Sequence, residues 1–140
     1  MKRCHYNILL IFNCIISLFA GILIYALFKR GTYFNNLIQH FISLPFYMVN
    51  TMVGKAILNW GCDFLWAYSL NFALALILKP FNRTILLSSL LAFSAGFLFE
   101  ILQYFGIFSG TYDFFDILSE TAAVTVSGLM IYKLKRMMKK

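Results

Sequence analysis

Charged side chains are scarce in this sequence. Only 12% of its 140 residues are charged and 61% are hydrophobic, whereas a soluble domain carries roughly 25% charged and 45–50% apolar residues. So short a chain cannot bury this much apolar surface in one core, because small domains bury the smallest share of their surface. The shortage of charge excludes a soluble globular domain and predicts one integral membrane domain over residues 1–140.

Residues that would mark a metal or catalytic site are also few. The three cysteines, Cys4, Cys14 and Cys62, lie far apart and without C-x-x-C spacing, which argues against a disulfide framework or a zinc site. The sequence contains no HExxH-like site, phosphate loop or credible nucleophile dyad. The sequence therefore favours a protein without enzymatic activity and predicts neither a metal nor a cofactor.

Four hydrophobic stretches are present, at about residues 8–28, 63–78, 84–108 and 116–132. A membrane-spanning helix needs about 20 mostly apolar residues. The first stretch is too long for the core of a signal peptide and has no A-x-A site after it, so it is expected to remain as an anchor. The sequence thus predicts an all-α, integral membrane four-helix bundle.

The distribution of basic residues indicates an orientation. With both termini inside, the inner segments hold nine basic residues and the outer segments hold Lys29, Arg30 and Lys55. The positive-inside rule then places the N- and C-termini in the cytoplasm of a multi-pass cell-membrane protein. Basic residues beside the membrane also account for the net charge of +7, and no recognition motif indicates a nucleic-acid partner.

The connection between the first two stretches is long and far from polar. Apolar residues recur at helical spacing on both sides of Pro45, which favours amphipathic helices at the outer surface of the membrane. A re-entrant segment around residues 42–58 is the alternative.

All five acidic residues lie at or after residue 63, and none lies in the first hydrophobic stretch. In the predicted topology every one of them falls in the outer leaflet or at its surface: Asp63, Glu100, Asp113, Asp116 and Glu120. Asp113 and Asp116 are also suited to cap the fourth helix, and Asp63 the second, because acids satisfy free N–H groups in a first turn.

Glu100 has no capping role, since it lies in the middle of the third stretch. A charged carboxylate near the centre of a bilayer costs about 2.5–3.5 kcal/mol. Glu100 is therefore expected to face the bundle, to accept a hydrogen bond or to hold its proton. Gln103 follows on the same helix face.

Two stripes of small residues support this orientation. Ser88, Ala92 and Gly96 recur every four residues before Glu100, and Ser119, Ala123 and Ser127 form a second stripe beside Glu120. Such stripes allow helices to approach closely in lipid. The short turn between the last two stretches makes them antiparallel neighbours, so Glu100 and Glu120 are expected at similar depth.

These residues carry a resemblance to a known family. The Glu-x-x-Gln of Glu100 and Gln103, followed by a turn and the D-x-x-D of Asp113 and Asp116, is similar to the signature of VanZ-like membrane proteins. The stretch from Asp63 to Tyr68 resembles the second-span motif of that family. Many relatives carry an arginine in the turn before the first aspartate, whereas residues 108–112 here contain none.

The resemblance implies a cell-envelope protein associated with teicoplanin-type glycopeptide resistance. The leading hypothesis is that an outward-facing acidic pocket binds a cationic or lipid-linked envelope ligand. Its expected binding residues are Glu100, Gln103, Asp113, Asp116, Glu120 and Asp63. The expected partners are membrane lipids and a lipid-linked envelope precursor. An intramembrane enzyme that uses paired carboxylates and an accessory subunit whose small-residue stripes contact partner helices remain the alternatives. Proton-coupled transport through Glu100, for which four spans would require a homodimer, is a further one.

Overall fold

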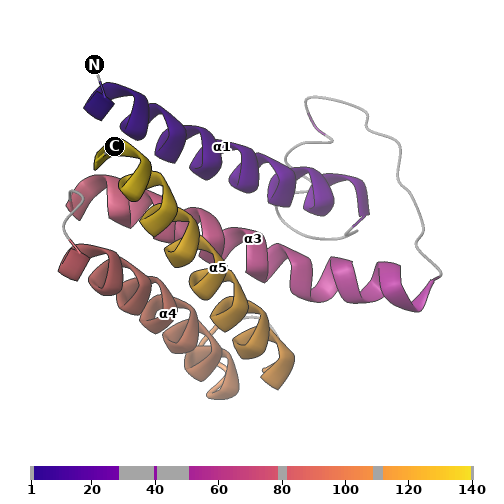
Figure 1. Cartoon of the computed structure of the whole chain (residues 1–140). Coiled ribbons are helices and arrows are strands. Elements are labelled where there is room, and N and C mark those ends of the chain that lie inside the picture. The colour runs from indigo at the N-terminus through magenta and orange to yellow at the C-terminus, as the bar shows by residue number, and fades with distance from the viewer. Residues whose placement is uncertain (1, 29–39, 41–50, 79–81, 109–111, 140) are drawn as a thin grey trace.

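The computed structural model of the protein describes residues 2–28, 40, 51–78, 82–108 and 112–139. These residues form four long helices (Figure 1): α1 (Lys2–Phe28), α3 (Met52–Leu78), α4 (Asn82–Tyr104) and α5 (Phe114–Lys139). By length and composition each of the four is able to cross a membrane. The prediction of an all-α bundle with four candidate spans is confirmed.

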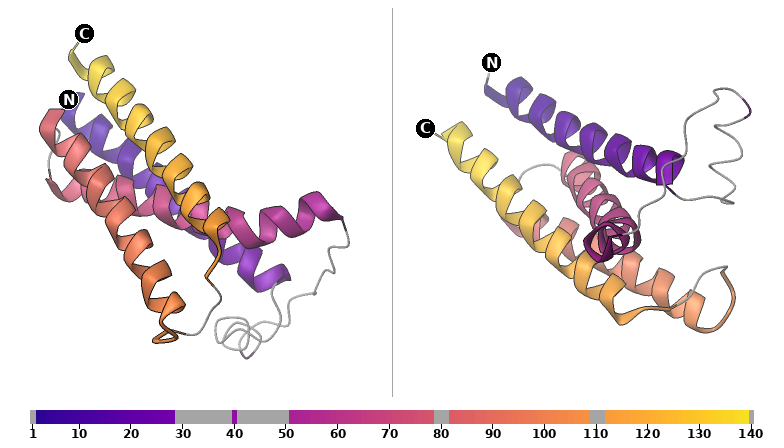
Figure 2. Two further views of the ribbon diagram at one scale, coloured as in Figure 1. Left: turned by 90° about the horizontal axis from the view of Figure 1, so that it is seen from below. Right: turned by 90° about the vertical axis from the view of Figure 1, so that its right-hand side faces the viewer.

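Helix α3 lies at the centre of the bundle and contacts each of the other three helices. Figures 1 and 2 show the two termini at one end, together with the end of α3 and the start of α4. The turn between α4 and α5 lies at the opposite end, so these two helices are antiparallel neighbours. Polar contacts join α1 to α3, where the Tyr68 hydroxyl donates to Asn13 Oδ1 at 3.2 Å and Ser69 Oγ to the Cys14 carbonyl at 3.0 Å.

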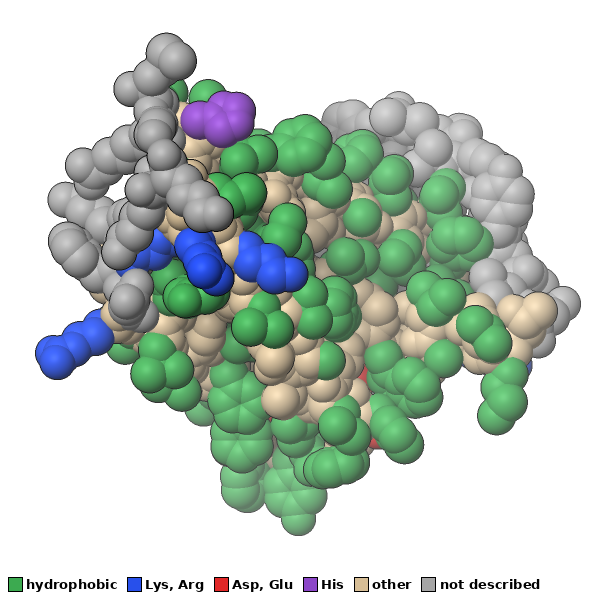
Figure 3. Space-filling model, viewed as in Figure 1, with side chains coloured by type: hydrophobic (Ala, Val, Ile, Leu, Met, Phe, Trp, Pro, Cys, Tyr) green, Lys and Arg blue, Asp and Glu red, His purple; other side chains and the backbone are tan. Residues whose placement is uncertain are grey.

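Large hydrophobic side chains cover much of the outer surface of the helices (Figure 3). Phe12 is 60% exposed, Ile77 72% and Leu86 64%. Exposed apolar surface on this scale marks a contact with other apolar material. In a bundle of membrane-spanning helices that material is lipid.

Helix α3 begins at Met52, and not at Asp63 as predicted. The hydroxyl of Thr51 accepts a hydrogen bond from the Gly54 amide at 3.2 Å, which is the contact of an N-cap residue. Asp63 therefore lies inside the helix and does not cap it. Residues 52–58, expected in an interfacial or re-entrant segment, belong to α3. Of the connection before Met52, the structure describes only His40 and Thr51.

The other helix ends differ less from the prediction. Helix α4 stops at Tyr104 rather than Phe108 because Gly106 adopts a φ of 68°. The Gly106 amide then donates to the Gln103 carbonyl and the Ile107 amide to the Leu102 carbonyl, each at 2.9 Å, the pair of bonds that defines a Schellman motif.

Helices α1 and α5 extend beyond the hydrophobic stretches, from Lys2 and to Lys139 respectively. Lysine and arginine are good helix formers, and positive charge is favourable at the C-terminal end of a helix. The basic tail therefore continues α5.

The interior of the bundle changes in character along its length. Near the termini it is apolar, with Tyr6, Leu10, Phe72 and Ile131 at most 2% exposed. Further along, the packing is made by small side chains that are fully buried: Ala67 of α3, Ala92 of α4 and Ala123 of α5. The two small-residue stripes thus face inward, as their spacing predicts, and bring α3, α4 and α5 close together.

Candidate functional site: a buried pair of carboxylates

Glu100 of α4 and Glu120 of α5 lie inside the bundle, beyond the alanine layer. Glu100 is 5% exposed and Glu120 is 4% exposed. The Glu120 carboxylate lies directly against Gly96, one helical turn before Glu100, and occupies the space that a Cβ atom would need there. The glycine of the first stripe thus makes room for the carboxylate of the facing helix.

The charged groups that act most strongly on these two carboxylates are also acidic. Glu120 experiences the charges of Glu100, Asp63 and Asp116, and Glu100 experiences those of Asp116 and Asp113. Like charges repel strongly where water is excluded. The structure therefore brings together negative groups that raise one another's energy.

Only part of the hydrogen-bonding capacity of the pair is used. The backbone amide of Asp113 donates to the Glu100 carboxylate. Glu100 Oε2 and Glu120 Oε2 are buried and find no hydrogen-bond partner within the described part of the chain. A buried carboxylate oxygen without a donor is costly, so each atom marks a place where a donor or a positive group would be stabilised.

Asp113 joins the start of α5 to α3. Its Oδ1 accepts from the Phe115 amide at 3.0 Å, and its Oδ2 accepts from Trp60 Nε1 at 3.3 Å. The first bond is that of an N-cap, as the sequence predicts for Asp113. Trp60 also packs its ring on Phe115, with centroids 4.8 Å apart, and its carbonyl accepts from Ser119 Oγ at 2.7 Å.

Trp60 is the site residue that the sequence analysis missed. It precedes Asp63 by almost one helical turn, so the two share a face of α3. That signal exists only if α3 begins before residue 60. Once the helix is placed at 63–78, Trp60 falls in the connection and resembles an aromatic residue at the membrane surface.

The remaining predicted site residues lie beside the carboxylate pair and are not part of it. Asp63 and Asp116 are half-buried and act on Glu120 through their charges. Gln103 is half-buried one turn beyond Glu100, and its carbonyl takes part in the end of α4. The structure thus brings Glu100, Glu120, Asp63, Asp113 and Asp116 into one acidic group, to which Gln103 is adjacent in the helix.

A second buried polar group lies on the other side of the alanine layer. Asn71 is fully buried, and its Nδ2 lies 2.7 Å from Ser127 Oγ, 3.1 Å from Ser89 Oγ and 3.3 Å from the Val124 carbonyl. These bonds tie α3 to both α4 and α5. Interhelical bonds of this kind stabilise membrane bundles, and the sequence analysis did not identify Asn71.

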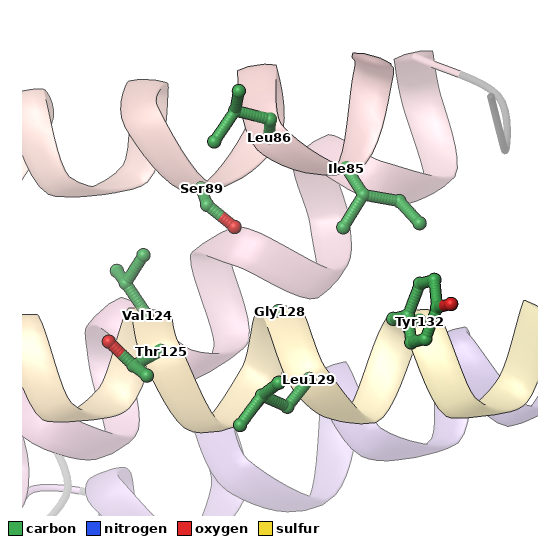
Figure 4. Close-up of a pocket in the computed structure, with 8 residues that line it drawn as sticks. All are labelled: Ile85, Leu86, Ser89, Val124, Thr125, Gly128, Leu129 and Tyr132. Carbon is green, nitrogen blue, oxygen red and sulfur yellow. The ribbon is translucent and has the colours of Figure 1, made fainter. Parts of the chain in front are cut away.

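An open groove of about 420 Å³ lies between α4 and α5, nearer the termini (Figure 4). Ser89, Leu86 and Ile85 line it from α4, and residues from Val124 to Tyr132 line it from α5. Its lining contains none of the five acidic residues. The groove is therefore distinct from the carboxylate pair.

The chemistry of the carboxylate pair favours a positive hydrogen-bond donor. No cluster of three or more His, Cys, Asp or Glu side chains with the geometry to hold a metal ion occurs in the residues that the structure describes. Comparison of the chain with protein-family models, curated proteins and solved structures gives no match. The proposed function therefore rests on the residues of the site.

Proposed function

We propose that the chain is a VanZ-like membrane protein of the cell envelope, and that it binds a positively charged envelope ligand through Glu100 and Glu120. The observation that carries this proposal is the pair of buried carboxylate oxygens that lack a donor, in a group whose strongest charged neighbours are acidic. A protein retains such an unfavourable arrangement where function requires it.

Each member of the acidic group has a separate part in the proposal. Glu100 and Glu120 contact the positive group of the ligand. Asp63 and Asp116 add negative potential that attracts it. Asp113 holds Trp60 and the start of α5, so it positions the site and does not bind.

The proposal includes an orientation, with the acidic group facing outward and the termini in the cytoplasm. The described basic side chains Arg83, Lys133, Lys135 and Arg136 belong to the end of the bundle that holds the termini, with a cluster of basic side chains visible there in Figure 3. The positive-inside rule supports this orientation.

Cysteine labelling tests the orientation. Single cysteines replace Arg83 and Tyr112, both exposed, in a chain whose three native cysteines are changed to serine or alanine. An impermeant maleimide added to intact cells is expected to label position 112 and not position 83. The reverse pattern would show that the acidic group faces the cytoplasm, and it would overturn the proposal of an envelope ligand.

The binding role is tested with Glu100→Gln, which keeps the shape and removes the charge. We expect the wild-type chain to lower the teicoplanin susceptibility of a sensitive bacterium, and Glu100→Gln to abolish this effect at equal abundance in the membrane. Thr125→Val is the matched control, because Thr125 is exposed and its hydroxyl donates to its own helix, at Thr121 O. Equal susceptibility with wild type and Glu100→Gln would exclude this site from the function.

A further inference from the structure

The surface around the carboxylate pair is unusually apolar for a charged site. At the α4–α5 end of the bundle, Phe105 is 69% exposed, Ile107 65% and Phe114 60%. Large apolar side chains at a turn are stable when they insert among lipids rather than in water. This end of the protein therefore lies within the interfacial region of the membrane.

Aromatic rings border the acidic group on two sides. Trp60 packs on Phe115 at the side of α5, and Phe99 packs on Trp66 and on Phe108 at the side of α4, with centroids 4.8, 6.1 and 5.1 Å apart. On the face in Figure 3, acidic atoms are visible only in small patches between hydrophobic side chains. A ligand that approaches along this surface meets hydrocarbon-like side chains before it meets the carboxylates.

The unpartnered oxygens define the polar group that would satisfy them. Both atoms are acceptors that require an N–H or O–H donor, and their acidic neighbours favour a positive one. A primary ammonium is compact and carries three N–H donors, whereas a guanidinium is wide and planar. Because Glu100 and Glu120 are only 5% and 4% exposed, little room surrounds their oxygens, and the compact donor suits them better.

We propose that the ligand is a membrane lipid with a primary ammonium in its headgroup, of which phosphatidylethanolamine is the simplest example. This inference rests on the proposed function and specifies its ligand class. The ammonium donates hydrogen bonds to Glu100 Oε2 and Glu120 Oε2, while the acyl chains remain in the bilayer against the exposed apolar side chains. The lipid reaches the site laterally from the outer leaflet, without passing through water.

Lipid retention by the full-length chain tests this proposal. The protein is reconstituted in membranes that contain phosphatidylglycerol with equal amounts of phosphatidylethanolamine and phosphatidylcholine, then extracted in mild detergent and analysed by native mass spectrometry. Phosphatidylcholine has the same phosphate and acyl chains, but its ammonium carries no N–H donor. We expect wild-type protein to retain phosphatidylethanolamine over phosphatidylcholine by about tenfold, because hydrogen bonds to a charged group are strong.

The variants assign this preference to the carboxylates. Glu100→Gln and Glu120→Gln are expected to retain the two lipids equally, and Thr125→Val to keep the wild-type preference. A preference that persists in both glutamine variants would overturn the proposal. The wild type gives a second measurement, since its unfolding midpoint is expected to be higher in membranes with phosphatidylethanolamine than with phosphatidylcholine, even if a variant fails to fold.

Two further outcomes separate this inference from the proposed function. Equal retention of both lipids by the wild type would overturn the lipid as ligand, while loss of the resistance effect in Glu100→Gln would still support a binding role for the site. Free ethanolamine is tested in the same unfolding experiment. If it raises the unfolding midpoint as much as phosphatidylethanolamine does, the ligand is a soluble amine and the lipid source is excluded.

Discussion

The two ends of the bundle differ in the kind of buried polar group that they hold. Toward the termini, Asn71 is fully buried, and its amide nitrogen lies within hydrogen-bond distance of acceptors on α4 and α5, while its Oδ1 and the Tyr6 hydroxyl have no hydrogen-bond partner among the described residues. Toward the α4–α5 turn, Glu100 and Glu120 are 5% and 4% exposed, and each has an oxygen without a described donor and acidic neighbours. The unpartnered atoms near the termini belong to neutral side chains, whereas those near the turn belong to carboxylates, whose burial without a donor costs more.

The polar group near the termini therefore serves stability, and the acidic group at the other end of the same helices serves function. Polar side chains that bond across helices in lipid contribute modestly to association. Carboxylates that lack donors oppose folding, so the acidic end is expected to be the less stable half until a ligand occupies it. Removing the buried polar group itself should therefore change stability with opposite sign at the two ends.

The largest effect is expected for Gly96→Ala. The new Cβ would overlap the Glu120 carboxylate, so α4 and α5 must separate or Glu120 must move. Glu120 has a flexible side chain, but it is only 4% exposed and has little room to move aside. We therefore expect a loss of about 3 kcal/mol in the free energy of unfolding, the upper part of the range for overpacking. Steric-trap or denaturant unfolding in lipid bicelles measures it.

Gly61→Ala is the matched control for this prediction. The nearest side-chain atom to its added Cβ would be Ile57 Cγ2 at 3.5 Å, an ordinary contact, and alanine favours a helix by about 1 kcal/mol over glycine. Gly61→Ala should therefore stabilise α3. If both glycine variants behave alike, Glu120 does not occupy the position over Gly96.

Much of this architecture follows from the sequence. Hydrophobic length predicts four spans, and the four-residue spacing from Ser88 to Gly96 predicts that Glu100 faces inward. Both rest on local periodicity, which the sequence carries directly. The acidic group could also be anticipated, because the short turn after α4 makes α4 and α5 neighbours.

The start of α3 could not be predicted in the same way. Residues before Asp63 carry apolar side chains at helical spacing with polar side chains opposite, a pattern shared by surface helices and by the projecting end of a span. The packing of Trp60 on Phe115 and its bond to Asp113 hold these residues against α5, and such long-range contacts leave no local pattern in the sequence. Asn71 was missed for a related reason, since its partners come from two other helices and leave no local pattern.

The second effect concerns Asn71, at the end of the bundle that holds the termini. Asn71→Leu removes the bonds to Ser89 and Ser127 and leaves their hydroxyls without that partner. We expect a loss of about 2 kcal/mol in the free energy of unfolding. Asn59→Leu, at an exposed position of the same helix, should change it little. A comparable loss in Asn59→Leu would mean that leucine disturbs α3 itself, and that Asn71 has no special role.

Removing a charge from the buried pair at the acidic end is expected to have the opposite sign. Glu120→Gln removes one charge from the group and supplies two N–H donors to its neighbours, so we expect a gain of about 1 kcal/mol in ligand-free detergent, as stability rises where function is lost. Lys133→Gln, an exposed charge at the other end, should have little effect. Destabilisation by Glu120→Gln would indicate that Glu120 already has a good partner, and the comparison between the two ends would fail.

The smallest effect tests how the acidic end is held in place. Trp60→Phe keeps an aromatic ring against Phe115 but removes the N–H that bonds Asp113 Oδ2. We expect a loss of only about 0.5 kcal/mol in the free energy of unfolding, because the bond is long and half-exposed.

Hydrogen exchange is the sharper measurement of the Trp60→Phe variant. Asp113 without its bond to Trp60 caps α5 less firmly, so the Phe115 amide, which donates to Asp113 Oδ1, should exchange faster. Trp66→Phe, whose ring packs on Phe99 instead, should leave that amide unchanged. If both variants speed its exchange equally, the effect comes from general loosening of α3, and Trp60 is not what positions Asp113.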